Sequence, residues 1–295
     1  MIRLLINIQE LVQRLGSGLL SILKIIFMSG LPNKFQKWKD DGKTIVILGT
    51  GPSLRQTLDN HFATLQGVPT MGLNHFAEKD TFDQIKPAYY MIGAPEIWEE
   101  GLNAYYTEKS IRLFEALRDK VHWPFQLFVG RAAKKSSRLE IIRSNNNIKV
   151  VFYNRTPAEG PDLIKHSIFN SKLGMPRPHN VLIPSIMVSF WMGFQKMILV
   201  GADHSWHESI RIEDSNTILL DQKHYYDTKE NWRPMGWKGQ RDRKLHEIFH
   251  KWMLSFKGYF EIVDYAQKQN FEVLNASEKS YIDAFPRIKF DTIEF

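Results

Sequence analysis

Cysteine is missing from this chain of 295 residues. The sequence therefore contains no disulfide framework, no thiolate zinc site and no cysteine nucleophile, and the absence fits a reducing compartment such as the cytoplasm. Internal repeats and low-complexity tracts are also missing. A composition of 43% hydrophobic and 24% charged residues excludes a disordered chain, a collagen and a disulfide scaffold.

Neither sign of charge dominates strongly. The chain has 39 Lys and Arg against 32 Asp and Glu, which gives a net charge of +7. This excess suits nucleotide phosphates, a membrane surface or nucleic acid, and does not choose among them. The basic residues between 131 and 143 are expected to form the solvated face of a helix. Because no basic and aromatic nucleic-acid module is visible, no nucleic-acid partner is predicted.

Residues 1–28 lack the uninterrupted apolar run of a spanning helix, because charges such as Arg14 interrupt it. Polar residues recur every three or four positions, and apolar residues keep the same spacing on another stripe, which predicts an amphipathic helix. Lys34, Lys37, Lys39 and Lys43 follow, as expected where a helix lies on anionic lipid. We predict peripheral membrane association through residues 1–28, at the inner face of the cytoplasmic membrane. Packing of this helix on the parent domain or on a second subunit is the alternative.

Beyond residue 43, short apolar runs alternate with helical stretches. Strands are predicted at 44–48, 68–73, 88–92, 125–129, 149–153, 196–200 and 271–274, and helices at 53–65, 96–106, 110–121, 132–143, 181–194 and 240–269. This alternation predicts an α/β fold with a mostly parallel sheet and helices on both faces. Residues 202–240 lose the periodicity and are expected to form a long functional loop. Two parts are therefore predicted, an N-terminal helix and linker at 1–42 and one domain at 43–295.

The sharpest local signal is the sequence that follows the first predicted strand, Gly49-Thr50-Gly51-Pro52-Ser53. Glycines let the backbone turn tightly and approach a ligand, and free N–H groups at a helix start favour phosphate. Leu54 stands where the dinucleotide fingerprint has its third glycine, and no Walker lysine follows. A phosphate or nucleotide site and a tight turn without ligand both remain open.

Polar residues also follow two other predicted strands. Asn74 ends the second strand, where an amide can contact a nucleotide or simply form a turn. Gly201 and Asp203 follow the strand at 196–200, and His204 and His207 come directly after them. These residue types can ligate a metal, but their spacing matches no known ligand set, so no metal site is predicted.

The sequence His224-Tyr225-Tyr226 lies within the aperiodic segment. An imidazole titrates near neutral pH, so a histidine beside phenols suits a general acid or base next to a phosphate-stabilising group. A plain surface loop is the alternative.

Taken together, these segments resemble the superfamily of bacterial family 42 sialyltransferases and MptE-like (DUF115) proteins. The resemblance spans about residues 43–285 and rests on four short motifs in the same order: Gly-Thr-Gly-Pro-Ser-Leu at 49–54, Asn74, Gly201-Ala202-Asp203, and 275–283. It implies a Rossmann-like nucleotide-binding domain with a lid over the site. Two features depart from the sialyltransferase pattern, since an Arg-x-x-Ser-Gly segment is not obvious near residues 178–185 and His204-Ser205-Trp206 replaces a tyrosine.

The resemblance also implies an activity. The sialyltransferase branch uses a CMP-activated nine-carbon sugar, needs no metal and has a histidine base. By motif, Gly49, Thr50, Gly51, Pro52 and Ser53 would face the nucleotide phosphate with Gly201 and Asp203 beside them, Asn74 would contact the nucleotide, and His224 would be the base. Tyr225 or Tyr226 would stabilise the leaving phosphate, and His204 and His207 are alternative bases.

The expected function is therefore a membrane-associated glycosyltransferase of surface polysaccharide or glycan synthesis. A CMP-sialic-acid-like donor is favoured, the acceptor is a glycan or a lipid-linked glycan, no cofactor is needed, and a homo-oligomer is compatible with the sequence. One alternative is an MptE-like pyrophosphokinase that transfers diphosphate from ATP and needs Mg²⁺, with Asp203 as a ligand. The other is a non-catalytic nucleotide-binding protein of glycan assembly.

Overall fold

The computed structural model describes the chain except for residues 1, 38–41, 228 and 238–240. Seven strands form one sheet in which every neighbouring pair is parallel. In spatial order the strands are β12 (Glu272–Asn275), β6 (Lys196–Val200), β1 (Thr44–Leu48), β2 (Thr70–Leu73), β3 (Tyr89–Ile92), β4 (Phe125–Gly130) and β5 (Ile148–Tyr153). Each lies within two residues of its predicted position. The central strands are buried on both faces, which is why they form near-continuous apolar runs.

The strand order reverses between β1 and β6. From β1 the chain steps outward through β2, β3, β4 and β5, and it then crosses back to place β6 and β12 on the other side of β1. In open parallel sheets, ligands bind at the carboxyl ends of the strands beside such a reversal. The turns that follow β1 and β6 are therefore the first place to look for a functional site.

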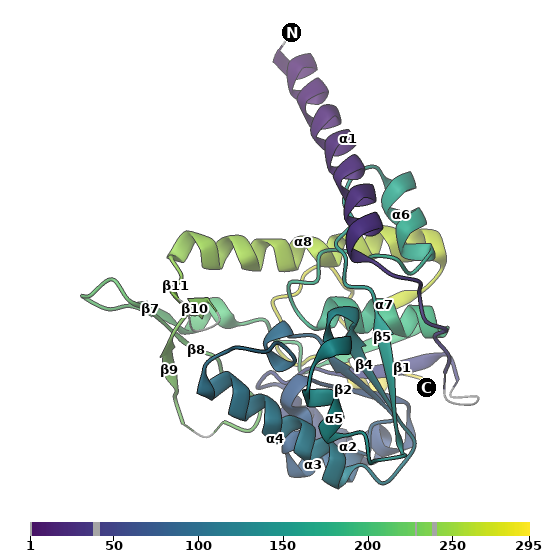
Figure 1. Ribbon diagram of the computed structural model, residues 1–295, viewed down its shortest axis with the longest axis vertical. Coiled ribbons are helices and arrows are strands. Elements are labelled where there is room, and N and C mark those ends of the chain that lie inside the picture. The colour runs from purple at the N-terminus through teal and green to yellow at the C-terminus, as the bar shows by residue number, and fades with distance from the viewer. Residues whose placement is uncertain (1, 38–41, 228, 238–240) are drawn as a thin grey trace.

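Helices cover both faces of the sheet (Figure 1). One face packs against α6 (Asp162–Asn170), α7 (Leu182–Met192) and α8 (Leu245–Gln269), and the other against α2 (Leu54–Gly67), α3 (Asp80–Ile85), α4 (Ala104–Lys120) and α5 (Arg138–Ile141). The predicted α/β class with a mostly parallel, Rossmann-like sheet is confirmed.

Two predicted helices, 96–106 and 110–121, prove to be a single one. Asn103 caps α4, because its side-chain oxygen accepts a hydrogen bond from the Tyr106 N–H at 3.2 Å. Ahead of this cap only a short 3₁₀ turn forms, Pro95–Ile97. An N-cap side chain marks the start of a helix, and hydrophobic periodicity does not show where such a cap lies. The sequence therefore predicted two helices where the structure has one.

Residues 202–240 do not form the structureless loop that was expected. They contain a 3₁₀ turn (Trp206–Ser209), a three-stranded antiparallel sheet of β7 (Ile210–Ile212), β8 (Ile218–Asp221) and β9 (Trp232–Pro234), and β10 (Gly236–Trp237), which pairs with β11 (Arg241–Asp242). Ile218 and Leu220 of β8 pack against Ile248 and Trp252 of α8 in a small core of their own. The strands were too short to show a clear alternation.

Helix α1 (Ile2–Met28) packs on the body through its polar side. The Ser21 hydroxyl donates to the Glu159 carbonyl at 3.0 Å and accepts from the Glu159 N–H at 2.8 Å. Arg14 lies 3.7 Å from Asp162, and a Cβ at Gly18 would stand 3.0 Å from Pro161. A helix of a water-soluble domain normally buries its apolar side. The orientation of α1 is the opposite of this.

The apolar side of α1 consequently faces outward, and the helix projects from the body (Figure 1). Its exposed large apolar side chains are Ile8, Leu11, Val12, Leu15, Leu19, Leu20, Ile22, Leu23, Ile26, Phe27 and Met28. The segment Asn7–Met28 is long and apolar enough to cross a membrane by length and composition, although the sequence had argued against spanning. Of the lysines that follow α1, Lys39 lies outside the described residues.

Candidate active site

The turns after β1 and β6 touch each other through glycines. A Cβ on Gly49 would lie 2.4 Å from the Gly201 carbonyl oxygen, and a Cβ on Gly201 would lie 2.5 Å from the Gly49 carbonyl oxygen. The Gly51 N–H donates to the Gly201 carbonyl at 2.9 Å. Gly201 also has a φ of +62°, which favours glycine. Close contact between two backbones is a sufficient reason for both glycines.

The side-chain carboxylate of Asp203 lies at the N-terminal end of α2, beside Ser53. Its carboxylate accepts hydrogen bonds from the Ser53 N–H at 3.0 Å and from the Ser53 hydroxyl at 2.7 Å. A Cβ on Gly51 would lie 2.2 Å from this carboxylate. Burial raises the pKa of Asp203, while the two bonds from Ser53 oppose that shift. The predicted phosphate-facing residues are thus brought together, but the Ser53 donors already serve an internal anion.

Asn74 lies at the end of β2 in the left-handed conformation, with a φ of +47°. Its side-chain oxygen accepts a hydrogen bond from the Gly93 N–H at 3.0 Å, which ties the end of β2 to the end of β3. Its carbonyl accepts from the Tyr90 hydroxyl at 2.6 Å. Asn74 therefore acts as a turn residue at the carboxyl edge, the position at which the sequence placed a nucleotide contact.

The His224-Tyr225-Tyr226 segment is attached directly to the turn after β1. The Tyr225 N–H donates to the Thr50 carbonyl at 3.1 Å, and the Arg55 guanidinium donates to the Tyr225 carbonyl at 3.0 and 3.1 Å. The Tyr225 side chain is only 6% exposed and packs against Phe76. Residues about 150 or more positions apart in sequence thus meet at one edge of the sheet.

His224 has the surroundings of an oriented base. Its Nδ1 lies 3.1 Å from the Asp227 carboxylate, which also accepts from the His224 N–H at 2.8 Å. The Tyr226 ring stacks on the imidazole at 5.1 Å, and Lys79 lies 3.6 Å from the centre of that ring. Burial lowers the pKa of His224, and Asp227 opposes this shift. With the proton on Nδ1, Nε2 is left as the acceptor.

A second imidazole, His75, stands beside this group and was not predicted. Its Nδ1 lies 2.5 Å from the Glu78 carboxylate. Burial lowers the pKa of His75, with Glu78 opposing and Lys109 adding to the shift. The pKa of His224 is itself lowered partly by Lys109 and His75. The only sequence signal for His75 was its place directly after Asn74.

The segment before α7 also reaches the carboxyl edge. Asn180 accepts from the Leu182 N–H at 2.9 Å and so caps α7, while a Cβ on Gly93 at the end of β3 would lie 2.7 Å from Val181. Among the described residues, Asn180 Nδ2 and His179 Nε2 are buried without a hydrogen-bond partner. Burial, and then Arg177 and Lys251, lower the pKa of His179 to about 4. The short run of prolines before an apolar helix could have signalled this segment.

The two alternative bases lie elsewhere. His204 is buried between Trp206, Phe256 and Tyr259, and its Nε2 lies 2.5 Å from the Tyr259 hydroxyl. Burial lowers the pKa of His204 to about 3. His207 is exposed and contacts Tyr281 edge-on. The described residues hold no group of three or more His, Asp or Glu side chains placed to bind a metal ion.

No protein-family model and no curated protein sequence matches this chain. Among solved structures, the chain is similar to a MAf glycosyltransferase from Magnetospirillum magneticum AMB-1, with a TM-score of 0.51 at 12% sequence identity. The match covers 91% of this chain and 37% of that one, so the chain spans well under half the length of that protein. The likeness is one of fold, and it agrees with the Rossmann-like α/β class of the sheet.

Proposed function

We propose that this protein is a glycosyltransferase that transfers a sugar from a nucleotide-activated donor to a glycan or lipid-linked acceptor. The fold shared with a glycosyltransferase supports this activity. A CMP-sialic-acid-like donor is favoured by the sequence resemblance. A nucleotide at the carboxyl edge would lie near the Thr50 side chain, the end of β2 at Asn74 and the turn after β6.

One observation carries the proposal: the anchoring of the His224 segment to the turn after β1. The backbone bond from Tyr225 to Thr50 and the Asp227 carboxylate on Nδ1 place an oriented imidazole at the edge where parallel sheets bind ligands. In the reaction, His224 Nε2 takes the proton of an acceptor hydroxyl while the hydroxyl oxygen bonds to the anomeric carbon. The bond from that carbon to the nucleotide phosphate oxygen breaks, and the nucleotide leaves with the electron pair.

Tyr226 and Lys79 suit the leaving phosphate. Tyr226 stacks on His224, and the Lys79 ammonium lies 3.6 Å from the centre of the Tyr226 ring. A cation and a phenol next to the base can stabilise negative charge as it develops on the phosphate. Tyr225, by contrast, is a buried anchor whose hydroxyl lies 3.4 Å from Thr81.

The ligand preference of the full chain tests this proposal. We expect CMP to raise the melting temperature more than UDP, GDP or ATP, with no need for Mg²⁺, because a ligand that binds only the folded state stabilises it. Hydrolysis of a CMP-sugar in the absence of acceptor would then measure turnover. A rise seen only with ATP and Mg²⁺ would instead favour the pyrophosphokinase.

We further propose that α1 attaches the enzyme to the cytoplasmic membrane. The helix directs its polar side, including Ser21 and Arg14, to the body and its apolar side outward, which suits insertion of that side into the headgroup boundary. The contacts of α1 with Pro161 and Glu159 hold its second half beside the body, which favours a shallow in-plane position over a full span.

Vesicle flotation tests this attachment. Replacing Leu15 and Leu19 with Glu should weaken binding about tenfold for each leucine, the loss expected for one apolar side chain. Ile212→Glu on β7, an equally exposed apolar residue of the body, is the control. Equal flotation of all variants would show that α1 does not bind the membrane, and a dimer that dissociates only in the leucine variants would assign the apolar side to a second copy.

A further inference from the structure

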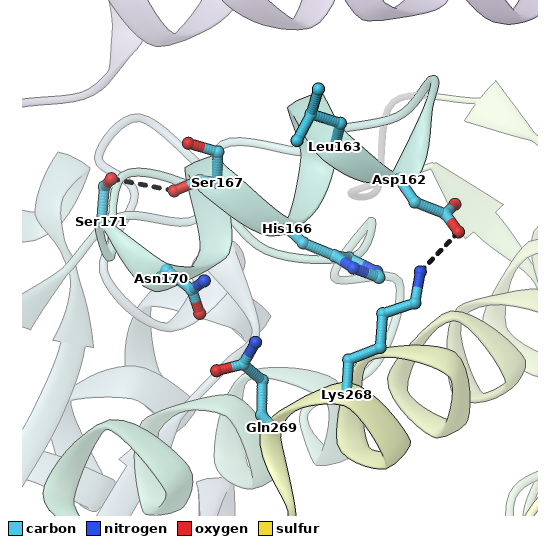
Figure 2. Close-up of a pocket in the computed structure, with 8 residues that line it drawn as sticks. All are labelled: Asp162, Leu163, His166, Ser167, Asn170, Ser171, Lys268 and Gln269. Atoms are coloured by element: carbon cyan, nitrogen blue, oxygen red, sulfur yellow. Dashed lines mark hydrogen bonds and ion pairs between the residues drawn. The ribbon is translucent and has the colours of Figure 1, made fainter.

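A polar groove of about 530 Å³ lies between α6 and the last turn of α8, away from the proposed active site (Figure 2). Asp162, His166 and Ser167 line it from α6, and Lys268 and Gln269 from α8. None of these residues belongs to the motifs that predicted the nucleotide site. The groove is open to solvent, but one of the polar side chains that line it is buried.

His166 is the buried polar group of this groove. Its side chain is almost fully buried, with 7% of the residue exposed, and its ring packs on Tyr265 at 5.2 Å. Among the described residues, its Nε2 has no hydrogen-bond partner. A buried nitrogen without a partner is costly, and such groups in folded proteins usually meet a ligand, an ion or water. An imidazole N–H in this position can donate to an anion oxygen.

The charges beside His166 are unbalanced. The Asp162 carboxylate lies 2.7 Å from Lys268, 3.2 Å from Lys165 and 3.7 Å from Arg14. Hydrogen bonds from Lys268 and Lys165 lower the pKa of Asp162 to about 2, so the carboxylate stays charged. Three cations share the Asp162 carboxylate, and at His166 the effect of Lys268 and Lys165 exceeds that of Asp162 and Asp264, which leaves this cluster suited to a second anion.

The position of the groove identifies the source of that anion. Arg14 belongs to α1, and the loop before α6 touches α1 at Gly18. Leu163, which lines the groove, is 86% exposed. If the apolar side of α1 lies in the headgroup boundary, as proposed above, the groove beside it comes close to the lipid phosphates.

We propose that the groove between α6 and α8 binds the phosphate of an anionic lipid headgroup and fixes the orientation of the protein on the membrane. His166 and Lys268 contact the phosphate, Lys165 and Arg14 add positive charge, and Leu163 reaches the acyl chains. This inference rests on the proposed attachment through α1, and it is independent of the proposed transferase activity.

Flotation of the full chain tests the site with two kinds of vesicle, phosphatidylcholine alone and phosphatidylcholine with phosphatidylglycerol. The parent chain should bind the anionic vesicles more tightly, and Lys268→Gln should remove about fivefold of that gain, the effect of one cation at a lipid surface. Lys289→Gln replaces an exposed lysine that does not line the groove, and it should keep the full gain. Equal losses in both variants would show general surface charge and overturn the site.

His166→Phe separates a ligand site from a structural role. Since the phenyl ring replaces a nitrogen without a partner, the variant should melt at the same temperature as the parent or higher, yet lose the gain on anionic vesicles. A lower melting temperature with an unchanged gain would make His166 a structural residue and overturn the proposal.

Two further outcomes separate the proposals from one another. If the parent binds both vesicle types equally, the groove proposal fails and the attachment through α1 stands, whereas no binding to any vesicle overturns both. Inorganic phosphate that raises the melting temperature of the parent but not of Lys268→Gln, without any preference for anionic vesicles, would replace the lipid with a soluble phosphate. Donor hydrolysis in solution reports on the transferase separately.

Discussion

Two groups of residues meet at the carboxyl edge of the sheet, and they use their polar atoms differently. In the turns after β1 and β6, the Gly51 N–H donates to the Gly201 carbonyl, and the Ser53 N–H and hydroxyl donate to the Asp203 carboxylate. In the neighbouring group, His224 and His75 each have one ring nitrogen beside a carboxylate, and no hydrogen bond to another described residue is found at the second nitrogen. The first group holds two backbones together, and the second contains the histidine that we propose as the base.

This difference shows that a glycine-rich sequence after a strand is compatible with two roles. The glycines after β1 look like a phosphate loop, yet the close approach they permit is to Gly201 and Asp203 of the same chain. A donor phosphate would have to use other groups, such as the Thr50 side chain or Lys79, or displace Asp203 from Ser53. Stability should therefore depend mainly on the first group and turnover mainly on the second.

The largest expected effect is on turnover, in the second group. His224→Ala should lower the rate of donor hydrolysis or transfer by about a hundred- to ten-thousand-fold, the range for loss of a general base. Nucleotide affinity and melting temperature should change little, because His224 is about one-third exposed. His207→Ala is the matched control on an exposed histidine. If His204→Ala loses activity and His224→Ala does not, the assignment of His224 as the base is wrong.

The next largest effect is on stability, in the first group. Gly51→Val should destabilise the fold by about 2–3 kcal/mol, because its Cβ would collide with Asp203 and with the Gly201 carbonyl. Urea unfolding of the purified chains measures this. Gly67→Ala, where an added Cβ meets nothing within 4 Å, should be neutral or slightly stabilising. If Gly51→Val unfolds like the parent and loses only nucleotide binding, the glycine serves a ligand after all.

The sequence predicted the sheet well because short apolar runs rich in β-branched and aromatic residues and bounded by Gly, Pro or Asn are typical of strands buried on both faces. Ile45 to Leu48 and Met197 to Val200 are examples, and both fell within a residue of the strands observed. The periodicity of α1 was equally visible. Its orientation was not, because the sequence does not say that Ser21 bonds to Glu159, 138 residues away.

The candidate site was predictable only in part, for the same reason. The residues after β1 and β6 follow strand ends and could be named from local sequence. The role of Asp203 at Ser53 and the attachment of Tyr225 to Thr50 join distant segments, so no local pattern encodes them. His75, His179 and Asn180 belong to no recognised motif, and their only sequence signals are the place of His75 after Asn74 and the prolines before α7.

A smaller effect concerns the stability of the protein in acid and depends on His204, which lies outside both groups. His204 has a folded-state pKa of about 3 because it is buried, against about 6.5 when unfolded. Protonation therefore favours the unfolded chain, so stability is intact above pH 6.5 and is lost as the pH falls toward 3, by up to about 1.4 kcal/mol per pH unit. His204→Gln should reduce this loss between pH 7 and pH 5 in urea unfolding, and the remaining slope comes from other histidines with a lowered pKa, such as His179. His207→Gln should keep the slope of the parent, and an equal slope in His204→Gln would show that His204 does not titrate in this way.

The smallest expected effect is a shift in the pH profile that tests how the second group is arranged. Burial lowers the pKa of His224, and the Asp227 carboxylate raises it in part. Asp227→Asn removes the opposing charge, so the pKa should fall further and the acid limb of kcat/KM should move to lower pH by less than about one unit. The maximal rate should also fall, because the amide orients the ring less firmly than the carboxylate does. Asp214→Asn, an exposed carboxylate beside β7, should leave the profile unchanged. An acid limb that moves upward in Asp227→Asn, or not at all, would mean that the titrating base is not the imidazole held by Asp227, and His75 beside Glu78 would then be the histidine to replace next.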